Sequence, residues 1–248
     1  MSESPVTYHK GDDPELVKAM ERARETFAGF FNQVSLDFNR IVPALELACV
    51  KAPFSDTPED PQAPVEQMWI DEVTFDGFDV IGKLLNHPNH LESVAAGDEV
   101  RVPLGRISDW ILVQDGEVHG GHTIQVIRSR MGETELEAHD EAWGLAFEPP
   151  DTVLLPERNE DFEGVIASLI IDQIEKEPMA VHEVFDNGRT VLHLEALYGR
   201  TPCVEVLLRN GADPEARCDR GLTAREYAAL LGWEEVVALL DEYGPGRE

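Results

Sequence analysis

Basic residues are scarce in this 248-residue sequence: 20 lysines and arginines stand against 49 aspartates and glutamates, which gives a formal net charge of −29. A surface of that sign repels phosphate backbones and anionic lipid headgroups, so we expect neither nucleic acid nor a membrane surface as a partner. A basic protein would be attracted to such a chain. The acidity also serves solubility without any specific partner.

Cysteine is equally rare, and the three that occur, Cys49, Cys203 and Cys218, form no CxxC pair. The sequence therefore indicates neither a disulfide framework nor a thiolate zinc site, and it favours a reducing compartment. The first fifteen residues, MSESPVTYHKGDDPE, contain no apolar segment, and no apolar run approaches the ~20 residues that span a bilayer. We expect a cytoplasmic protein.

Residues 13–147 predict an α+β domain in which one helix lies on a strongly curved antiparallel sheet. Asp13 can cap that helix, Pro14 suits its first position, and apolar residues then recur at three- and four-residue steps as far as Phe31. Alternating or β-branched segments that bury one or both faces predict the strands. They are residues 44–50, 67–75, 78–85, 98–104, 106–113 and 122–128. A short Asp-Gly turn between residues 67–75 and 78–85 suits a hairpin.

Residues 106–123, RISDWILVQDGEVHGGHT, contain an Asp-Gly pair, two histidines and a Gly-Gly step. Apolar residues alternate on both sides of the first half, which predicts a strand that is buried on both faces. The Asp-Gly pair predicts a tight turn, after which residues 122–128 are expected to return as the partner strand. Gly120 and Gly121 suit a sharp turn or a close backbone approach. We interpret this stretch as a structural hairpin.

The middle of the chain is its most acidic part. Residues 131–163 hold 11 acids and 1 base, a net charge of −10, against −11 for residues 1–130 and −8 for residues 164–248. A short acidic helix is expected to close the first domain, and the proline-containing residues 148–161 are expected to form a linker.

The C-terminal third is self-similar at an offset of 33 residues, with nine identities between the two copies, among them Gly188 with Gly221 and Thr190 with Thr223. This period, a Gly-x-Thr that opens each copy, and the segment LLRNGAD resemble ankyrin repeats, one degenerate and two clear, over about residues 162–244. We expect residues 162–248 to form an all-α repeat solenoid.

The ankyrin resemblance implies structural roles for helix caps, helix stops and a hydrogen-bonding scaffold histidine. Glu195 stands where the family usually has alanine and Val191 where it usually has proline, and the second copy opens with TARE, as terminal capping repeats often do. The residues to which the motif assigns these structural roles are Gly188, Thr190, His193, Gly199, Gly211, Gly221, Thr223 and Gly232.

The first domain carries motif pieces that include Lys51 to Phe54, Trp69, Asn86, Pro88 and residues 107–110. Over about residues 15–146 these pieces resemble the YegJ-like family of bacterial domains of unknown function. Such domains are also found joined to ankyrin repeats. The resemblance implies a fold and a bacterial origin, and it brings no established activity.

Two HxxH steps, His87/His90 and His119/His122, are the candidates for a metal site, since four imidazoles could ligate zinc or copper if their loops converged. Neither step has the i, i+4 helical spacing or the glutamate of a metalloprotease. The family resemblance does not rest on these histidines either. We therefore expect no metal and no cofactor.

Asp109 beside Trp110, with Lys51 near them in motif order, is the candidate for acid–base or nucleophilic chemistry. A carboxyl against an indole can have a raised pKa, as a general acid requires. Asp109 could equally accept backbone hydrogen bonds at a strand bend, and no Ser-His-Asp, Cys-His or phosphate-loop signature accompanies it. We assign no catalytic residue and favour a non-enzymatic protein.

These patterns predict a protein–protein interaction role, as an adaptor or inhibitor in the bacterial cytoplasm that binds a partner through the concave ankyrin surface. One alternative is an immunity-type inhibitor whose acidity neutralises a basic toxin. Another is an uncharacterised enzyme or metal-binding activity in the first domain. The repeats could also serve only to stabilise that domain.

Overall fold

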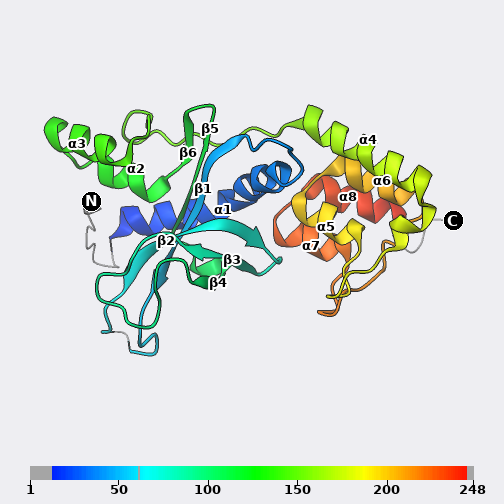
Figure 1. Ribbon diagram of the computed structural model, residues 1–248, viewed down its shortest axis with the longest axis horizontal. Helices are drawn as coiled ribbons and strands as arrows, with labels where there is room; N and C mark the ends of the chain where they lie inside the picture. Colours follow the sequence, from blue (N-terminus) through cyan, green and yellow to red (C-terminus); the bar gives the residue numbers. More distant parts are fainter. Residues whose placement is uncertain (1–12, 61, 245–248) are drawn as a thin grey trace. The chain divides into compact units, whose positions relative to one another are not determined.

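The computed structural model describes residues 13–60 and 62–244, which form two compact units (Figure 1). Unit 1 holds the described residues up to Phe30 together with Arg40–Pro156. Unit 2 holds Phe31–Asn39 together with the described residues from Glu157 onward. The first helix, α1, therefore contributes to both units, and part of the expected linker, residues 148–156, belongs to unit 1.

Unit 1 is built on an antiparallel sheet of order β4-β3-β2-β1-β5-β6, which confirms the predicted α+β class. The Asp-Gly turns predicted between β2 and β3 and between β5 and β6 both join hairpin strands. The elements are α1 (Pro14–Asp37), β1 (Leu45–Phe54), β2 (Glu66–Phe75), β3 (Asp79–Leu84), β4 (Glu99–Pro103), β5 (Asp109–Gln114), β6 (Glu117–Gly120), α2 (His122–Arg128) and α3 (Glu133–Trp143).

Helix α1 begins where the sequence predicts it. The Asp13 carboxylate accepts a hydrogen bond from the Glu15 amide at 3.0 Å, which satisfies a first-turn donor that has no helical partner. Phe27 and Phe30 are fully buried, and the Phe30 ring lies 5.3 Å from that of Trp110 on β5. The helix thus covers one face of the sheet.

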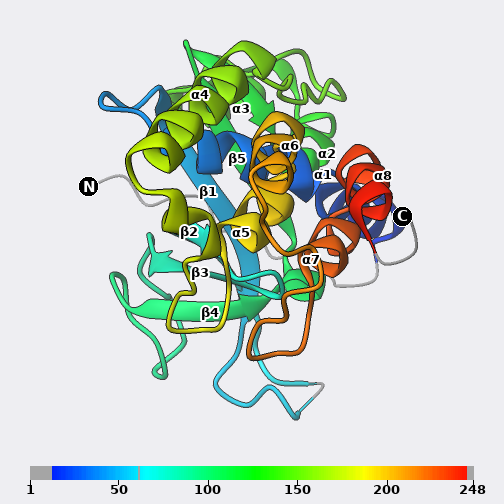
Figure 2. The ribbon, with the colours of Figure 1, turned by 90° about the vertical axis from the view of Figure 1, so that its right-hand side faces the viewer.

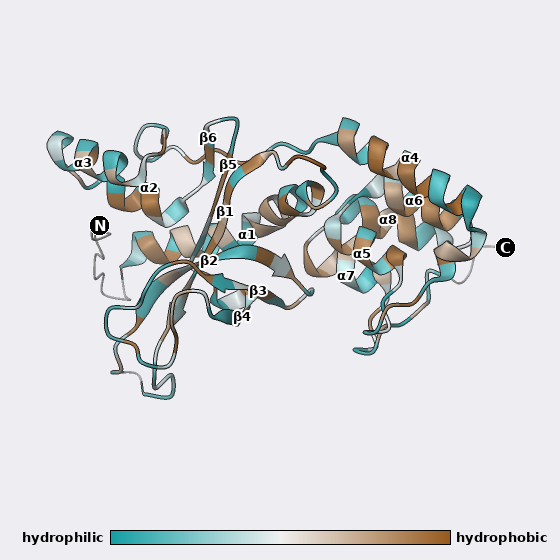
Figure 3. Cartoon of the chain, viewed as in Figure 1, coloured by the Kyte–Doolittle hydropathy of each residue, from teal (hydrophilic) through white to brown (hydrophobic). Residues whose placement is uncertain are grey.

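The other face of β5 is covered by α2 and α3, so this strand is buried on both sides, as predicted. The two helices are joined by Arg128, whose guanidinium binds the Asp140 carboxylate at 2.8 and 2.5 Å. Helix α3 is the expected short acidic helix and is drawn largely in the hydrophilic colour in Figure 3.

The prediction of a strand at residues 122–128 is wrong, because this segment is helix α2 and the returning strand is the four-residue β6. Gly120 and Gly121 both have positive φ, 76° and 68°, which ends the strand at once. The amides of His122 and Thr123 then meet the Asp109 carboxylate, which satisfies the start of a helix. Tertiary contacts override the β-branched composition here.

Besides the end of α1, unit 2 consists of α4 followed by two antiparallel helix pairs, which confirms the predicted repeat solenoid (Figures 1 and 2). In each pair the first helix begins at a threonine that forms a capping box, Thr190 and Thr223. The helices are α4 (Glu160–Lys176), α5 (Val191–Tyr198), α6 (Thr201–Arg209), α7 (Ala224–Leu230) and α8 (Glu234–Tyr243), and a short 3₁₀ turn, η2 (Pro178–His182), precedes α5.

Candidate functional site

Two candidate residues, Lys51 and Asp109, lie with Trp69 in one row across unit 1. In the strand register, Lys51 of β1 pairs with Trp69 of β2 on one side and with Asp109 of β5 on the other. Directly paired residues in an antiparallel sheet point to the same face. Because α2 begins over this face, Thr123 is brought against the row, with its hydroxyl 3.5 Å from the Lys51 amine.

The Asp109 carboxylate is fully buried and accepts four hydrogen bonds. The amides of Trp110, His122 and Thr123 donate at 2.9, 2.9 and 2.8 Å, and the Thr123 hydroxyl donates at 2.5 Å. This geometry is that of a carboxylate that anchors a helix start to a strand. Asp109 therefore accepts backbone hydrogen bonds, which is the structural role that the sequence offered as an alternative to catalysis. It does not face an open cleft.

Lys51 is half-buried, as is Trp69 beside it. The Lys51 amine lies 5.5 Å from the centre of the Trp69 ring. Burial lowers the pKa of this amine, although the negative charge of Asp109 acts in the opposite direction. Trp69 in turn packs edge-on against Trp143 of α3 at 5.8 Å. A lysine amine, a hydroxyl and an aromatic wall thus meet where the helices cover the sheet.

Trp110 points to the opposite face from Asp109 and lies in the core. Its indole N–H donates to the Ala23 carbonyl at 2.9 Å, and its ring is fully buried. Gly120 lies against this ring, since a Cβ at that position would overlap both the ring and the carbonyl of Trp110. Trp110 and Asp109 are neighbours in sequence that do not share a site.

The four candidate metal histidines are not brought together. In the described residues, no group of three or more His, Cys, Asp or Glu side chains could hold a metal ion. His122 is buried on α2, where its Nε2 lies 3.0 Å from the Thr26 hydroxyl and burial lowers its pKa, whereas His119 lies within β6. His87 and His90 lie on the loop after β3, and the His90 amide donates to the Glu66 carboxylate at 2.5 Å.

The ankyrin motif residues of unit 2 occupy turns and caps. His193 Nδ1 accepts a hydrogen bond from the Thr190 amide at 3.0 Å, and its Nε2 lies 3.1 Å from the Leu222 carbonyl in the next repeat. In the capping box of α7, the Glu226 carboxylate accepts a hydrogen bond from the Thr223 amide at 2.8 Å. The motif glycines, all with positive φ, are Gly188, Gly199, Gly211, Gly221 and Gly232.

A buried polar network between the end of α1 and the repeats was missed by sequence reasoning. Arg200, 1% exposed, donates to the Ser35 carbonyl at 2.5 Å and to the Glu195 carboxylate at 3.3 Å. Asn32 donates to Glu163 at 3.2 Å, and both side chains are fully buried. The signal in the sequence was Glu195, a charge at a position where the ankyrin motif has alanine.

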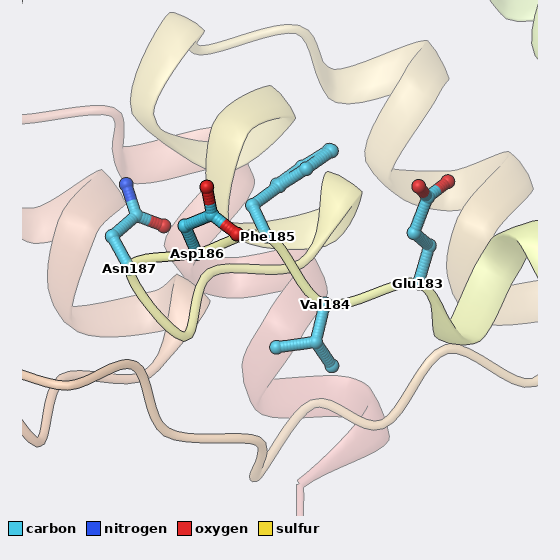
Figure 4. Close-up of a pocket in the computed structure, with 5 residues that line it drawn as sticks. All are labelled: Glu183, Val184, Phe185, Asp186 and Asn187. Carbon is cyan, nitrogen blue, oxygen red and sulfur yellow. The ribbon is translucent and has the colours of Figure 1, made fainter.

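The turn between α4 and α5 exposes large apolar side chains. Met179, Val184 and Phe185 are 69%, 61% and 37% exposed. Residues 183–187 line an open depression here, and Figure 4 shows Val184 and Phe185 projecting from different sides of the chain. Large apolar side chains that are exposed this close together in the chain are candidates for contact with another protein.

The fold and the repeats define a two-part protein: an α+β domain and an ankyrin-type helical array. Residues 13–147 match the family described as "Uncharacterized protein conserved in bacteria", DUF2314, and the chain belongs to that family. Residues 178–228 also match ankyrin repeats.

Two relatives match this chain over different lengths. A protein described as an ankyrin repeat protein from Neisseria meningitidis serogroup B is 38% identical over 251 residues, covering 97% of this chain and 98% of its own length. The uncharacterized protein YegJ of Escherichia coli K12 is 32% identical over 75 residues, 30% of this chain and 46% of its own length. The repeats and the first relative support a protein-interaction role. Across residues 13–60 and 62–244, no helix has the length and apolar character needed to cross a membrane.

Proposed function

We propose that the chain is a non-enzymatic adaptor or inhibitor that binds another protein through the repeat array, with the turn at residues 179–187 as the main contact. The observation that carries the proposal is the exposure of Met179, Val184 and Phe185 within seven residues. The turn directly precedes α5, the first helix of a repeat, so it lies beside the surface through which a solenoid recognises its partner.

The charge around this turn selects a partner of opposite sign. Glu177, Glu183 and Asp186 are exposed on the same segment, and the whole chain carries a net charge of −29. Complementary charge accelerates association and rejects acidic competitors. We therefore assign the partner a surface that combines basic and apolar residues.

An immunity-type inhibitor of a basic toxin is a narrower form of this proposal, and the strong acidity supports it. An inhibitor abolishes its partner's activity when it binds, whereas an adaptor leaves that activity intact while it recruits a third protein. Assay of the captured partner with and without the chain separates the two forms.

The bacterial cytoplasm is the compartment that we assign to this function. All three cysteines, Cys49, Cys203 and Cys218, are free and buried. Free thiols persist where the cell keeps cysteines reduced, which supports the assignment.

The test is capture from a lysate of the source bacterium on three immobilised full-length proteins: the wild type, Val184→Ala/Phe185→Ala, and a control, Leu85→Ala. Leu85 is a 51% exposed leucine of unit 1, so its substitution removes a similar apolar surface elsewhere. We expect a basic protein that wild type and control retain and the double variant loses, with binding that weakens as salt increases. Equal capture by all three proteins would overturn the proposed contact.

A further inference from the structure

Unit 1 contains a reactive-group arrangement that the proposed binding function does not use. We propose that Lys51 is an amine nucleophile that condenses reversibly with a small aromatic carbonyl compound held against Trp69. The geometry behind the proposal is the row of Trp69, Lys51 and Asp109 across β2, β1 and β5, with Thr123 above it.

The first step concerns the hydrogen bonds of the amine. A lysine ammonium has three donors, and the hydrogen bond from Lys51 in the described structure is a long one, 3.5 Å to the Thr123 hydroxyl. Asp109, the carboxylate whose charge acts on this amine, already accepts four hydrogen bonds from other groups. Burial disfavours the Lys51 cation more than the Trp69 ring and the Asp109 charge stabilise it, which favours the neutral, nucleophilic amine.

The second step concerns proton transfer. The Thr123 hydroxyl accepts from Lys51 and donates to Asp109 at 2.5 Å, so a hydrogen-bonded path runs from the amine to a buried carboxylate. Thr123 and Asp109 are positioning residues in this arrangement, because only Lys51 bonds to the carbonyl compound. His122, on the same helix as Thr123, and Asp71 and Cys49, in the adjacent row of the sheet, are the other titratable groups near this path.

The third step concerns the partner molecule. The Trp69 ring lies 5.5 Å below the amine, and the Trp143 ring meets it edge-on at 5.8 Å. Lys51, Trp69 and Trp143 are all half-buried, so each keeps part of its surface in contact with solvent. A flat, uncharged aromatic group packs well on such a wall. The chain's strong negative charge disfavours an anionic ligand.

The reaction balances without an oxidant or a reductant. The Lys51 nitrogen adds to the carbonyl carbon, which forms a C–N bond and converts C=O into a hydroxyl. One amine hydrogen passes to that oxygen during the addition, and the hydroxyl then leaves with the remaining amine hydrogen as one molecule of water, so that the C–N bond becomes the C=N bond of the imine. Addition of water reverses the sequence.

The chain supplies its own control in Lys83 of β3. This amine forms an ion pair with Glu72 at 2.7 Å, and that hydrogen bond raises its pKa. Its side chain is 47% exposed, so access alone favours Lys83 over the half-buried Lys51. Faster reaction at Lys51 would therefore report chemical activation and not exposure.

The experiment treats the intact, folded chain with benzaldehyde and cyanoborohydride at pH 7, traps the imine as a secondary amine, and quantifies each lysine by peptide mass spectrometry. We expect Lys51 to be labelled about tenfold or more faster than Lys83. Labelling of Lys51 at the same rate as Lys83 or more slowly, or only after the chain is unfolded in urea, would overturn the proposal.

Two variants test the path through the hydroxyl. Thr123→Val removes the hydroxyl at nearly constant volume and should slow labelling of Lys51 several-fold while Lys83 is unchanged. Thr123→Ser keeps the hydroxyl and should restore the rate. Thermal unfolding of each variant verifies the fold, and an unchanged rate in folded Thr123→Val would contradict the assigned role of Thr123. None of these measurements depends on the repeat array, so they stand or fall separately from partner binding.

Discussion

The guanidinium of Arg200, between α5 and α6, lies 2.5 Å from the carbonyl oxygen of Ser35, a residue of α1 that is 165 positions earlier in the chain. Both side chains are buried, and Glu195 completes the arrangement from within the repeat. Burial raises the pKa of Glu195, which the attraction of Arg200 opposes. The repeat array of unit 2 therefore includes the end of α1.

Arg200→Met should destabilise unit 2 by about 3–5 kcal/mol, because it leaves Glu195 buried without its counter-charge. The double variant Arg200→Met/Glu195→Ala should recover part of this loss. Urea unfolding followed by circular dichroism measures both. The control is Arg209→Met, at an exposed ion pair with Glu205, which should change stability by less than about 0.5 kcal/mol. Equal effects of the two single substitutions would contradict the structural role of the network.

Leu36→Ala should destabilise the same unit by about 2–5 kcal/mol. Leu36 is 1% exposed and packs with Ile166, Ala167 and Cys203, so its truncation leaves a cavity. Phe38, two residues further along, is 57% exposed, and Phe38→Ala should have little effect on the free energy of unfolding. A smaller loss for Leu36→Ala than for Phe38→Ala would show that the end of α1 does not contribute to the stability of the repeats.

Gly120→Ala should destabilise unit 1 by about 3 kcal/mol or more, since it adds a clash with Trp110 to the strain of a positive φ. Gly116→Ala is the matched control: its φ is +77° against +76° for Gly120, and an added Cβ meets nothing within 4 Å. This second substitution should therefore cost only about 1–2 kcal/mol. The difference between the two unfolding free energies measures the steric contact with Trp110, and equal values would argue against it.

Acidification should destabilise unit 1 through His122. Burial lowers the pKa of this imidazole below its ordinary value of 6.5, so the folded state holds it neutral while the unfolded chain binds a proton. The stability that His122 contributes is complete above the pKa of the imidazole in the unfolded chain. It is lost as the pH falls through 6.5 toward the lower pKa of the imidazole in the folded state. Urea midpoints between pH 8 and pH 5.5 should therefore fall less in His122→Gln than in the wild type. Parallel curves for the two proteins over this range would contradict the assignment.

The sequence predicted the elements that short-range patterns determine. Helix α1 followed from Asp13, Pro14 and the three- and four-residue apolar steps, and the hairpins followed from Asp-Gly turns between alternating strands. The repeats followed from their period, which recurs because each pair of helices stacks on the next in the same way.

What the sequence could not predict depends on residues that are far apart in the chain. Helix α2 has a strand-like composition, and its start is fixed by Asp109, 14 positions before Thr123. The contact between Arg200 and Ser35 spans 165 positions, and no local pattern encodes it. For the candidate site, the sequence showed which side chains could carry chemistry, namely Lys51, Asp109 and Trp110. Only the strand register shows that Asp109 and Lys51 lie on one face of the sheet and Trp110 on the other.

The sharing of α1 between the units has a consequence for how this architecture can be divided or inherited. The residues of the two units alternate along the chain, so no single cut yields two fragments that each contain a whole unit. A gene fragment that encodes only the chain from Glu157 onward would leave Arg200 without Ser35 and the apolar cluster without Leu36. The repeats and the end of α1 are therefore expected to be transmitted together as one cassette, and transplanting the repeats to another protein should require that helix end as well.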